Sequence, residues 1–398
     1  MIVMQRVWLR VVVIALLLLS TSNFVWGEEP SLLFEWRQFD TGYLLQGLPW
    51  SPDNASLAIT SLDNAAVLLT NRTTWEVERQ IALPTTEFPL TRLWWSPNGH
   101  YIAVANDFEL IVLDTMAATS SQFTDRLPVI DGRWIDARWL GNSNVLAVLN
   151  NSGLIVLLDV VRQEISDEIE LDGFLAGEAF YTAFDWNETR GLFAAPLYSS
   201  NTIGFWNESG AMPNGLVREM APNENRFASP CGAWRPEGES SLEFDFSQLG
   251  GNVDVTDLQW SLDGTHLALV ANYNVVICTI NAERTDITAI YQRRIPDLLY
   301  DPNAPQADQT MPYSLTNKVA WSPDDRWLLV SLLPLPLEVP TNSCGLAVFD
   351  GMQDFSYIGM IGEQLCFIQD MSWSPDGSQL TVQAGTDGQY WLGTLQAE

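Results

Sequence analysis

Basic residues are scarce in this chain of 398 residues. There are 19 lysines and arginines against 49 aspartates and glutamates, which gives a formal net charge of −30, and Lys318 is the only lysine. A surface with this balance repels phosphate backbones. Nucleic acid is therefore not expected among the partners of this protein.

The residues that most often perform catalysis are also few. The chain has two histidines, His100 and His266, and no CxxC, HExxH, P-loop or GxSxG motif. We therefore expect no catalytic residue, no metal, no cofactor and no enzymatic activity. The acidic stretch 297–308 offers the oxygen ligands that calcium prefers, but its spacing is not that of an EF-hand, and a solvated loop is the simpler interpretation.

The N-terminal segment has the features of a secretory signal. Arg6 and Arg10 precede an apolar run at 11–19, and the small residue Gly27 ends a cleavage site before Glu28. The apolar run is short for a membrane span of about 20 residues, which favours cleavage over a retained anchor. We expect residues 1–27 to be a signal peptide, residues 28–398 to be the mature domain, and the protein to be secreted, periplasmic or extracellular.

An internal repeat dominates the rest of the sequence. Seven strand-like runs end in Trp and are followed by a tight turn, most often Ser-Pro-Asp-Gly or close to it: Trp50, Trp95, Trp139, Trp186, Trp260, Trp321 and Trp373. The first four are 45, 44 and 47 residues apart, and such a period is typical of four-stranded propeller blades. In these turns Pro presets the first corner and Gly supplies a positive φ.

The segments between the turns complete the unit. A short apolar strand follows each turn, then a third strand that often ends in an apolar residue and Asp or Asn, then a more polar strand that suits an outer edge. The pattern predicts an all-β fold, a seven-bladed β-propeller of four-stranded antiparallel blades. After Trp373 only two more strands fit, at 379–383 and 389–395, so we expect the N-terminal strand 32–38 to complete the last blade and close the ring.

These motifs resemble the repeats of the WD40 and TolB-like propeller families. The Trp-Ser-Pro-Asp-Gly turn is similar to both, and the ending of the third strand in an apolar residue and Asp is similar to the Trp-Asp that names WD40 repeats. The resemblance covers the whole mature chain and implies the propeller fold. It implies little about function, because such scaffolds carry many different sites.

Three insertions interrupt the repeat. The spacing grows to 74, 61 and 52 residues after Trp186, and the extra residues fall at 221–253, 295–314 and 333–343. In an up-and-down blade, the turns between second and third strands share one face with the crossovers between blades. All three insertions therefore project from one face of blades four to six, where binding sites commonly lie, although packing decoration is the alternative.

Trp234 and Arg235 lie in the longest insertion and are the candidate binding residues, because Trp and Arg dominate binding hot spots. A Trp packed beneath its own loop is the alternative.

Four cysteines in an exported protein allow up to two disulfides in three connectivities. Cys344 and Cys366 are favoured because both begin strands at the loop-rich face. Cys231 also reaches this face, and Cys278 lies mid-strand as a candidate buried thiol.

The sequence thus favours an exported monomeric scaffold that binds a protein or peptide through the loop-rich face of blades four to six. No stable membrane insertion is expected after signal cleavage. The alternative is an extracellular propeller enzyme that acts on glycans or similar substrates, with carboxylates at the mouth of the channel.

Overall fold

A computed structural model of the chain describes residues 34–39, 45–46, 49–61, 65–86, 90, 92–106, 108–123, 134–141, 144–150, 152–171, 184–197, 202–207, 255–271, 274–280, 287–294, 313–335, 344–385 and 389–395. All regular secondary structure in these ranges is β-strand. No helix in them is long and apolar enough to cross a membrane.

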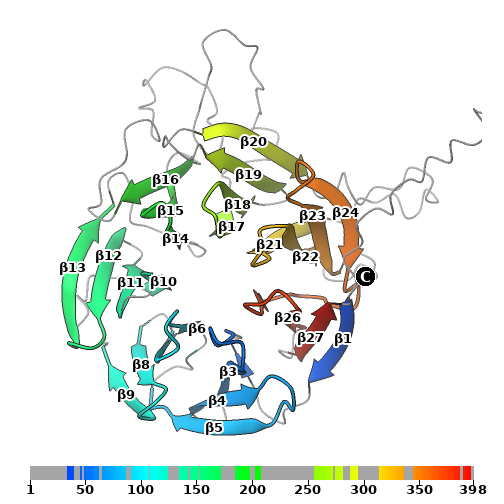
Figure 1. Cartoon of the computed structure of the whole chain (residues 1–398). Helices are drawn as coiled ribbons and strands as arrows, with labels where there is room; N and C mark the ends of the chain where they lie inside the picture. The colour runs from blue at the N-terminus through cyan, green and yellow to red at the C-terminus, as the bar shows by residue number, and fades with distance from the viewer. Residues whose placement is uncertain are drawn as a thin grey trace, which may run out of the picture. The chain divides into compact units, whose positions relative to one another are not determined.

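The strands form seven antiparallel sheets arranged in a ring, which is the predicted seven-bladed β-propeller (Figure 1). From inner to outer strand, the blades are β2 (Leu45–Gln46), β3 (Ser56–Ser61), β4 (Ala66–Asn71), β5 (Val77–Ala82); β6 (Arg92–Trp95), β7 (Tyr101–Ala105), β8 (Leu110–Asp114), β9 (Thr119–Gln122); β10 (Trp134–Trp139), β11 (Val145–Asn150), β12 (Leu154–Asp159), β13 (Glu164–Glu170); β14 (Asp185–Asn187), β15 (Leu192–Leu197), β16 (Thr202–Asn207); β17 (Val255–Trp260), β18 (His266–Ala271), β19 (Asn274–Ile280), β20 (Ile287–Arg294); β21 (Tyr313–Trp321), β22 (Trp327–Leu335), β23 (Leu346–Asp350), β24 (Ser356–Ile361); and β25 (Asp370–Trp373), β26 (Gln379–Ala384), β27 (Gln389–Leu395), β1 (Phe34–Phe39).

Six blades have four strands, and blade four has three within the described ranges. The middle strands are almost fully buried, because a neighbouring blade covers each face of every sheet; β23, for example, is buried at all five positions. Between blades five and six, Val270 and Ile277 pack against Trp321 and Val330. The outer strands are polar, as expected, and β13 is exposed at five of its seven positions.

Three of the seven repeated Trp residues bond their blade to the one before it. The indole N–H of Trp139 donates to the carbonyl of Trp94, 3.0 Å away, and Trp321 donates to Gln259 at 3.2 Å. Trp50 makes the same bond to Ser372 at 3.2 Å, between blades one and seven. In each of these three cases the acceptor directly precedes the repeat Trp of the neighbouring blade. The indole N–H of Trp95 donates instead to Gly99 in its own turn at 3.1 Å, and those of Trp186, Trp260 and Trp373 are buried without a hydrogen-bond partner among the described residues.

Five of the seven turns after the repeat Trp are stabilised by a Ser and by the Asp or Asn two residues later. The Ser374 hydroxyl donates to Asp376 at 2.7 Å and accepts the backbone N–H of Gln379 at 2.9 Å. The corresponding serines are at most 3% exposed, and four more copies form the same pair of bonds: Ser51, Ser96, Ser261 and Ser322. The turn thereby satisfies polar groups that would otherwise be buried without partners.

The N-terminal strand closes the ring as predicted. β1 pairs antiparallel with β27, from Phe34 opposite Leu395 to Phe39 opposite Tyr390. The Cβ direction of Gly393 meets the rings of Phe34 and Trp36 within 3.1 Å, so a larger side chain in β27 would collide with β1. The closing strand covers the outer edge of β27 and gives blade seven its fourth strand.

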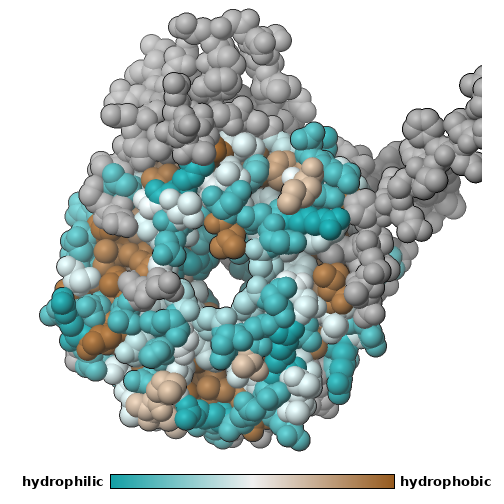
Figure 2. Space-filling model, in the orientation of Figure 1, coloured by the Kyte–Doolittle hydropathy of each residue, from teal (hydrophilic) through white to brown (hydrophobic). Residues whose placement is uncertain are grey.

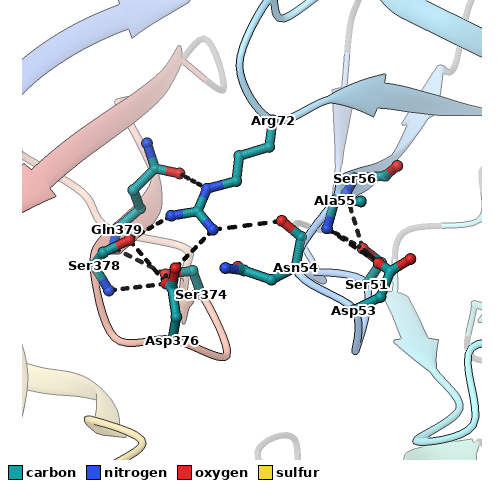
Figure 3. Close-up of polar contacts among 10 residues, drawn as sticks. All are labelled: Ser51, Asp53, Asn54, Ala55, Ser56, Arg72, Ser374, Asp376, Ser378 and Gln379. Atoms are coloured by element: carbon teal, nitrogen blue, oxygen red, sulfur yellow. Dashed lines mark hydrogen bonds and ion pairs between the residues drawn. The ribbon is translucent and has the colours of Figure 1, made fainter.

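A second contact between the first and last blades lies at the turns (Figure 3). Arg72, which follows β4, donates to Asp376 at 2.7 Å and to the side chain of Gln379 at 2.9 Å, and also bonds Ser378. Its guanidinium lies 5.8 Å from the ring centre of Trp50. One arginine therefore joins blade one to the turn of blade seven.

Blade six departs from the predicted boundaries. Residues 313–314 and 333–335, which we assigned to insertions, belong to strands β21 and β22, which pair out to Tyr313 opposite Leu335. These strands have nine residues each because their hairpin extends beyond β23. The rest of the three insertions lies outside the described ranges.

Candidate functional site

The structure tests the cysteine predictions but not the binding pair. Cys344 and Cys366 form a disulfide with their Cα atoms 4.8 Å apart. Cys278 is fully buried, and it is disulfide-bonded, so the free thiol expected there is wrong. A mid-strand position predicted burial but not bonding. Trp234 and Arg235 lie outside the described residues.

A belt of charged side chains surrounds the central channel. Figure 2 shows the ring open at its centre, and the inner strand of each blade borders this opening (Figure 1). The position three residues before the repeat Trp carries a charge on five blades: Arg92, Asp136, Asp257, Lys318 and Asp370. Side chains alternate along a strand, so the residue directly before each Trp points to the same side and adds Arg138 and Asp185.

Arg138 links two of the belt carboxylates. Its guanidinium lies 2.8 Å from Asp136 on its own strand and 2.9 Å from Asp185 on blade four. The side chain is 26% exposed, against 16% for Asp136 and 12% for Asp185. Burial lowers the pKa of Arg138, but the two carboxylates outweigh it and leave the pKa raised. Arg138 therefore stays charged and neutralises two partly buried acids.

Side-chain oxygens of the belt and of Gln259 also accept hydrogen bonds from backbone N–H groups of the inner strand of the next blade. Asp185 accepts the backbone N–H of Trp260 at 2.8 Å, and Asp257 accepts that of Val319 at 3.1 Å. Gln259 accepts that of Trp321 at 2.7 Å. An inner strand has no strand beyond it to accept these N–H groups, so side chains from the preceding blade take that role.

Lys318, the only lysine, lies between acids from both neighbouring blades. Asp257 of blade five raises its pKa most, burial opposes this, and Asp370 of blade seven raises it further. Its backbone N–H donates to Ser331 at 2.8 Å. Within the described ranges, no carboxylate oxygen lies within ion-pairing distance of its ammonium group, so these acids act on Lys318 through space, without direct contact.

Burial raises the pKa of the belt carboxyls Asp185, Asp257 and Asp370, and the cations only partly oppose it. The belt combines four aspartates on blades three, four, five and seven with Arg92, Arg138 and Lys318. Among the described residues, no group of three or more His, Cys, Asp or Glu side chains could hold a metal ion. The two histidines are not part of the belt: His266 packs edge-on against Phe355, 5.0 Å between ring centres.

Sequence reasoning missed this belt, although the signal was present. Aligning the seven repeat Trp residues shows charge at the same offset on five blades, in the inner strands of the ring. A charged side chain on a partly buried inner strand needs opposite charges or hydrogen-bond partners nearby, and the neighbouring blades provide them.

The ring of sheets and its charged channel define the class of protein, a seven-bladed β-propeller. The sequence matches no protein-family profile and no curated protein. The fold is similar to the crystal structure of the Myceliophteria thermophila Cps50 (Swd1) β-propeller domain, with 11% sequence identity and a TM-score of 0.60. That similarity covers 92% of this chain and 100% of the other.

Proposed function

We propose that this propeller is an exported scaffold without enzymatic activity that binds a protein or peptide through the loop-rich face of blades four to six. The observation that carries this is the long hairpin of blade six. β22 pairs with β21 out to Leu335, but with β23 only out to Ser331. The hairpin therefore projects past the sheet, at the strand ends where the insertions begin.

A disulfide and backbone hydrogen bonds hold this face of blade six in place. The Cys344–Cys366 disulfide ties the connection before β23 to the crossover into blade seven. Around it, the Gly345 N–H donates to the Leu365 carbonyl at 3.0 Å, and the Gly385 N–H donates to that of Cys366 at 2.6 Å. Elements held in place before binding lose less entropy when a partner docks. The likeness of the turns to WD40 and TolB-like repeats agrees with a scaffold role.

The test is site-specific crosslinking with the mature protein. A photo-reactive residue at position 234 is expected to capture a partner from the native extracellular fraction, and Trp234→Ala and Arg235→Ala are expected to weaken its binding by about tenfold or more. The matched control is a photo-reactive residue at position 262. Leu262 is 70% exposed and belongs to a Trp turn, on the opposite face. Partner capture at position 262 but not at position 234 would place binding on the face of the Trp turns and would contradict the proposal.

Export is tested separately. Intact mass of the secreted protein should correspond to a chain that begins at Glu28. Retention of residues 1–27 in a membrane fraction would make the protein an anchored scaffold.

The belt supports a second candidate, an enzyme acting on glycans. Acids whose pKa is raised by burial, such as Asp257 and Asp370, suit a general acid. Their bonds to the backbone N–H groups of Val319 and Met371 favour a structural role instead. Hydrolysis of a glycoside panel that disappears in Asp257→Asn and Asp370→Asn variants of unchanged stability would establish the enzyme.

A further inference from the structure

The outer strand of blade six differs from every other described outer strand. β5, β13, β20 and β1 all carry charged residues, and β9 is made of Thr, Ser and Gln. β24 has the sequence SYIGMI, without any charge. It lies on the rim of the ring (Figure 1) and pairs with β23 alone in the described part of the chain. Propellers usually protect such edges with charge.

The bulged residue of β24 is also less polar than the bulged residues of other outer strands. Outer strands of blades one, three, five and six each contain one bulged residue at an equivalent place: Glu78, Ser166, Thr288 and Ile358. Three of these are polar, but the residue in β24 is a half-buried isoleucine. All six residues of β24 are half-buried rather than exposed, so the strand presents an apolar rim beside backbone groups that no other described strand pairs.

Part of β24 is already used by the core. Tyr357 packs on Phe349 with 5.8 Å between ring centres, and Tyr357 and Met360 both contact the core between blades five and six. Gly359 has a φ of 151°, and no atom lies within 4 Å of the place where a Cβ would stand. A glycine within a strand commonly marks the close approach of another backbone.

Charge selects the occupant. Exposed Asp354 and Glu363 lie just beyond the two ends of β24. Antiparallel pairing of two copies through β24 would bring Asp354 of each copy toward Glu363 of the other, at both ends, in a protein with a net charge of −30. Such like-charge contacts disfavour a dimer. A foreign strand with an apolar centre and basic ends would match the same edge.

We propose that β24 is a second interaction surface, separate from the loop-rich face, at which an extended partner segment adds a strand to blade six. The segment has alternating apolar residues and a Lys or Arg near each end. Its backbone pairs with the free edge of β24, and its basic ends meet Asp354 and Glu363.

The probe is a blocked peptide with a core of alternating Val and Thr and Arg at both ends. We expect saturable binding by fluorescence anisotropy, together with slower hydrogen exchange at residues 356–361. The same core with Glu at both ends, and an Arg-ended core N-methylated along one edge, should bind about tenfold more weakly or not at all. Equal binding of all three peptides would mean that charge alone attracts them, and would overturn the proposal.

Two protein variants locate the site. Ile358→Lys should weaken the Arg-ended peptide about tenfold, because it restores a protective charge to the edge. Val77→Lys is the matched control on β5, where Val77 is 46% exposed, and should leave binding unchanged. If Ile358→Lys does not fold, the exposed double variant Asp354→Arg/Glu363→Arg should reverse the preference toward the Glu-ended peptide. Unchanged preference, equal loss in Val77→Lys, or exchange protection elsewhere would overturn the assignment.

Discussion

Arg72 and Asp376 are 304 positions apart in the sequence, yet the guanidinium of one lies 2.7 Å from the carboxylate of the other (Figure 3). The pair joins the first blade to the last on the face of the Trp turns. It complements β1, which joins the same two ends of the chain by backbone pairing.

We expect Arg72→Ala to lower the free energy of unfolding by about 1–2 kcal/mol, because the side chain bonds three residues of blade seven and lies against Trp50. The control is Arg162→Ala. Arg162 is 71% exposed and, among the described residues, pairs only with acids of its own blade, at 3.5 Å and 3.8 Å, so its loss should change stability by about 0.5 kcal/mol or less. Chemical denaturation measures both, and equal losses would contradict a closing role for Arg72.

Asp376 should contribute to the loss of unfolding free energy at low pH. Burial acts to raise the pKa of this carboxyl, but hydrogen bonds from Ser374, Ser378 and Arg72 outweigh it and lower the pKa from 3.8 to about 2. The lowered pKa stabilises the fold above pH 3.8, and this contribution is lost as the pH falls toward 2. The difference between wild type and Asp376→Asn should therefore shrink over this range in urea titrations. A difference independent of pH would rule out the linkage.

Lys318→Met should destabilise the fold by about 3 kcal/mol at pH 7, because it leaves Asp257 and Asp370 without their shared cation. The pKa values of these acids are already raised by burial, so the charged acids cost stability as the pH rises above 3.8. The loss should accordingly be smaller at pH 4, where the acids take up protons. Lys318→Arg keeps the charge and should recover most of the stability; an equal loss at both pH values would argue against the electrostatic explanation.

Two turn residues with positive φ should respond in opposite ways to glycine. Asn54 has a φ of 63° and a buried side-chain oxygen without a partner, so Asn54→Gly should be neutral or stabilise by about 0.5 kcal/mol. Asp325 has a φ of 56°, but its carboxylate accepts the backbone N–H groups of Leu262 and Asp263 at 2.6 and 2.9 Å. Asp325→Gly should cost about 1–2 kcal/mol. Thermal melts of the two variants check the sign of each.

Deleting residues 28–40 should destabilise the fold by about 5 kcal/mol or prevent cooperative unfolding, because it removes all six β1 residues paired with β27. Deleting residues 28–32 keeps β1 and serves as the control. A melt unaffected by the longer deletion would show that the ring closes without this strand.

The fold could be predicted because each blade repeats the same local chemistry. In five of the seven turns the Ser bonds the Asp or Asn two residues later, so the repeat can be recognised in the sequence, and the closing strand followed from counting what remained after Trp373. The belt could not be predicted in the same way. Arg138 and Asp185 are 47 positions apart, and what brings them together is the stacking of blades. The exact reach of the blade-six hairpin was missed because Pro334 and the leucines around it look like a loop.

The pairing of Phe34 with Leu395 brings the first and last strands of the propeller out at one place on the rim. A short linker between them would therefore leave the ring intact. New ends could then be opened at the turn of Gly99, where no neighbouring atom lies within 4 Å of the missing Cβ. Such a circular permutant would carry the closing seam within blade two instead of blade seven, and comparing its folding rate with that of the parent would measure how much of folding waits for the two ends to meet.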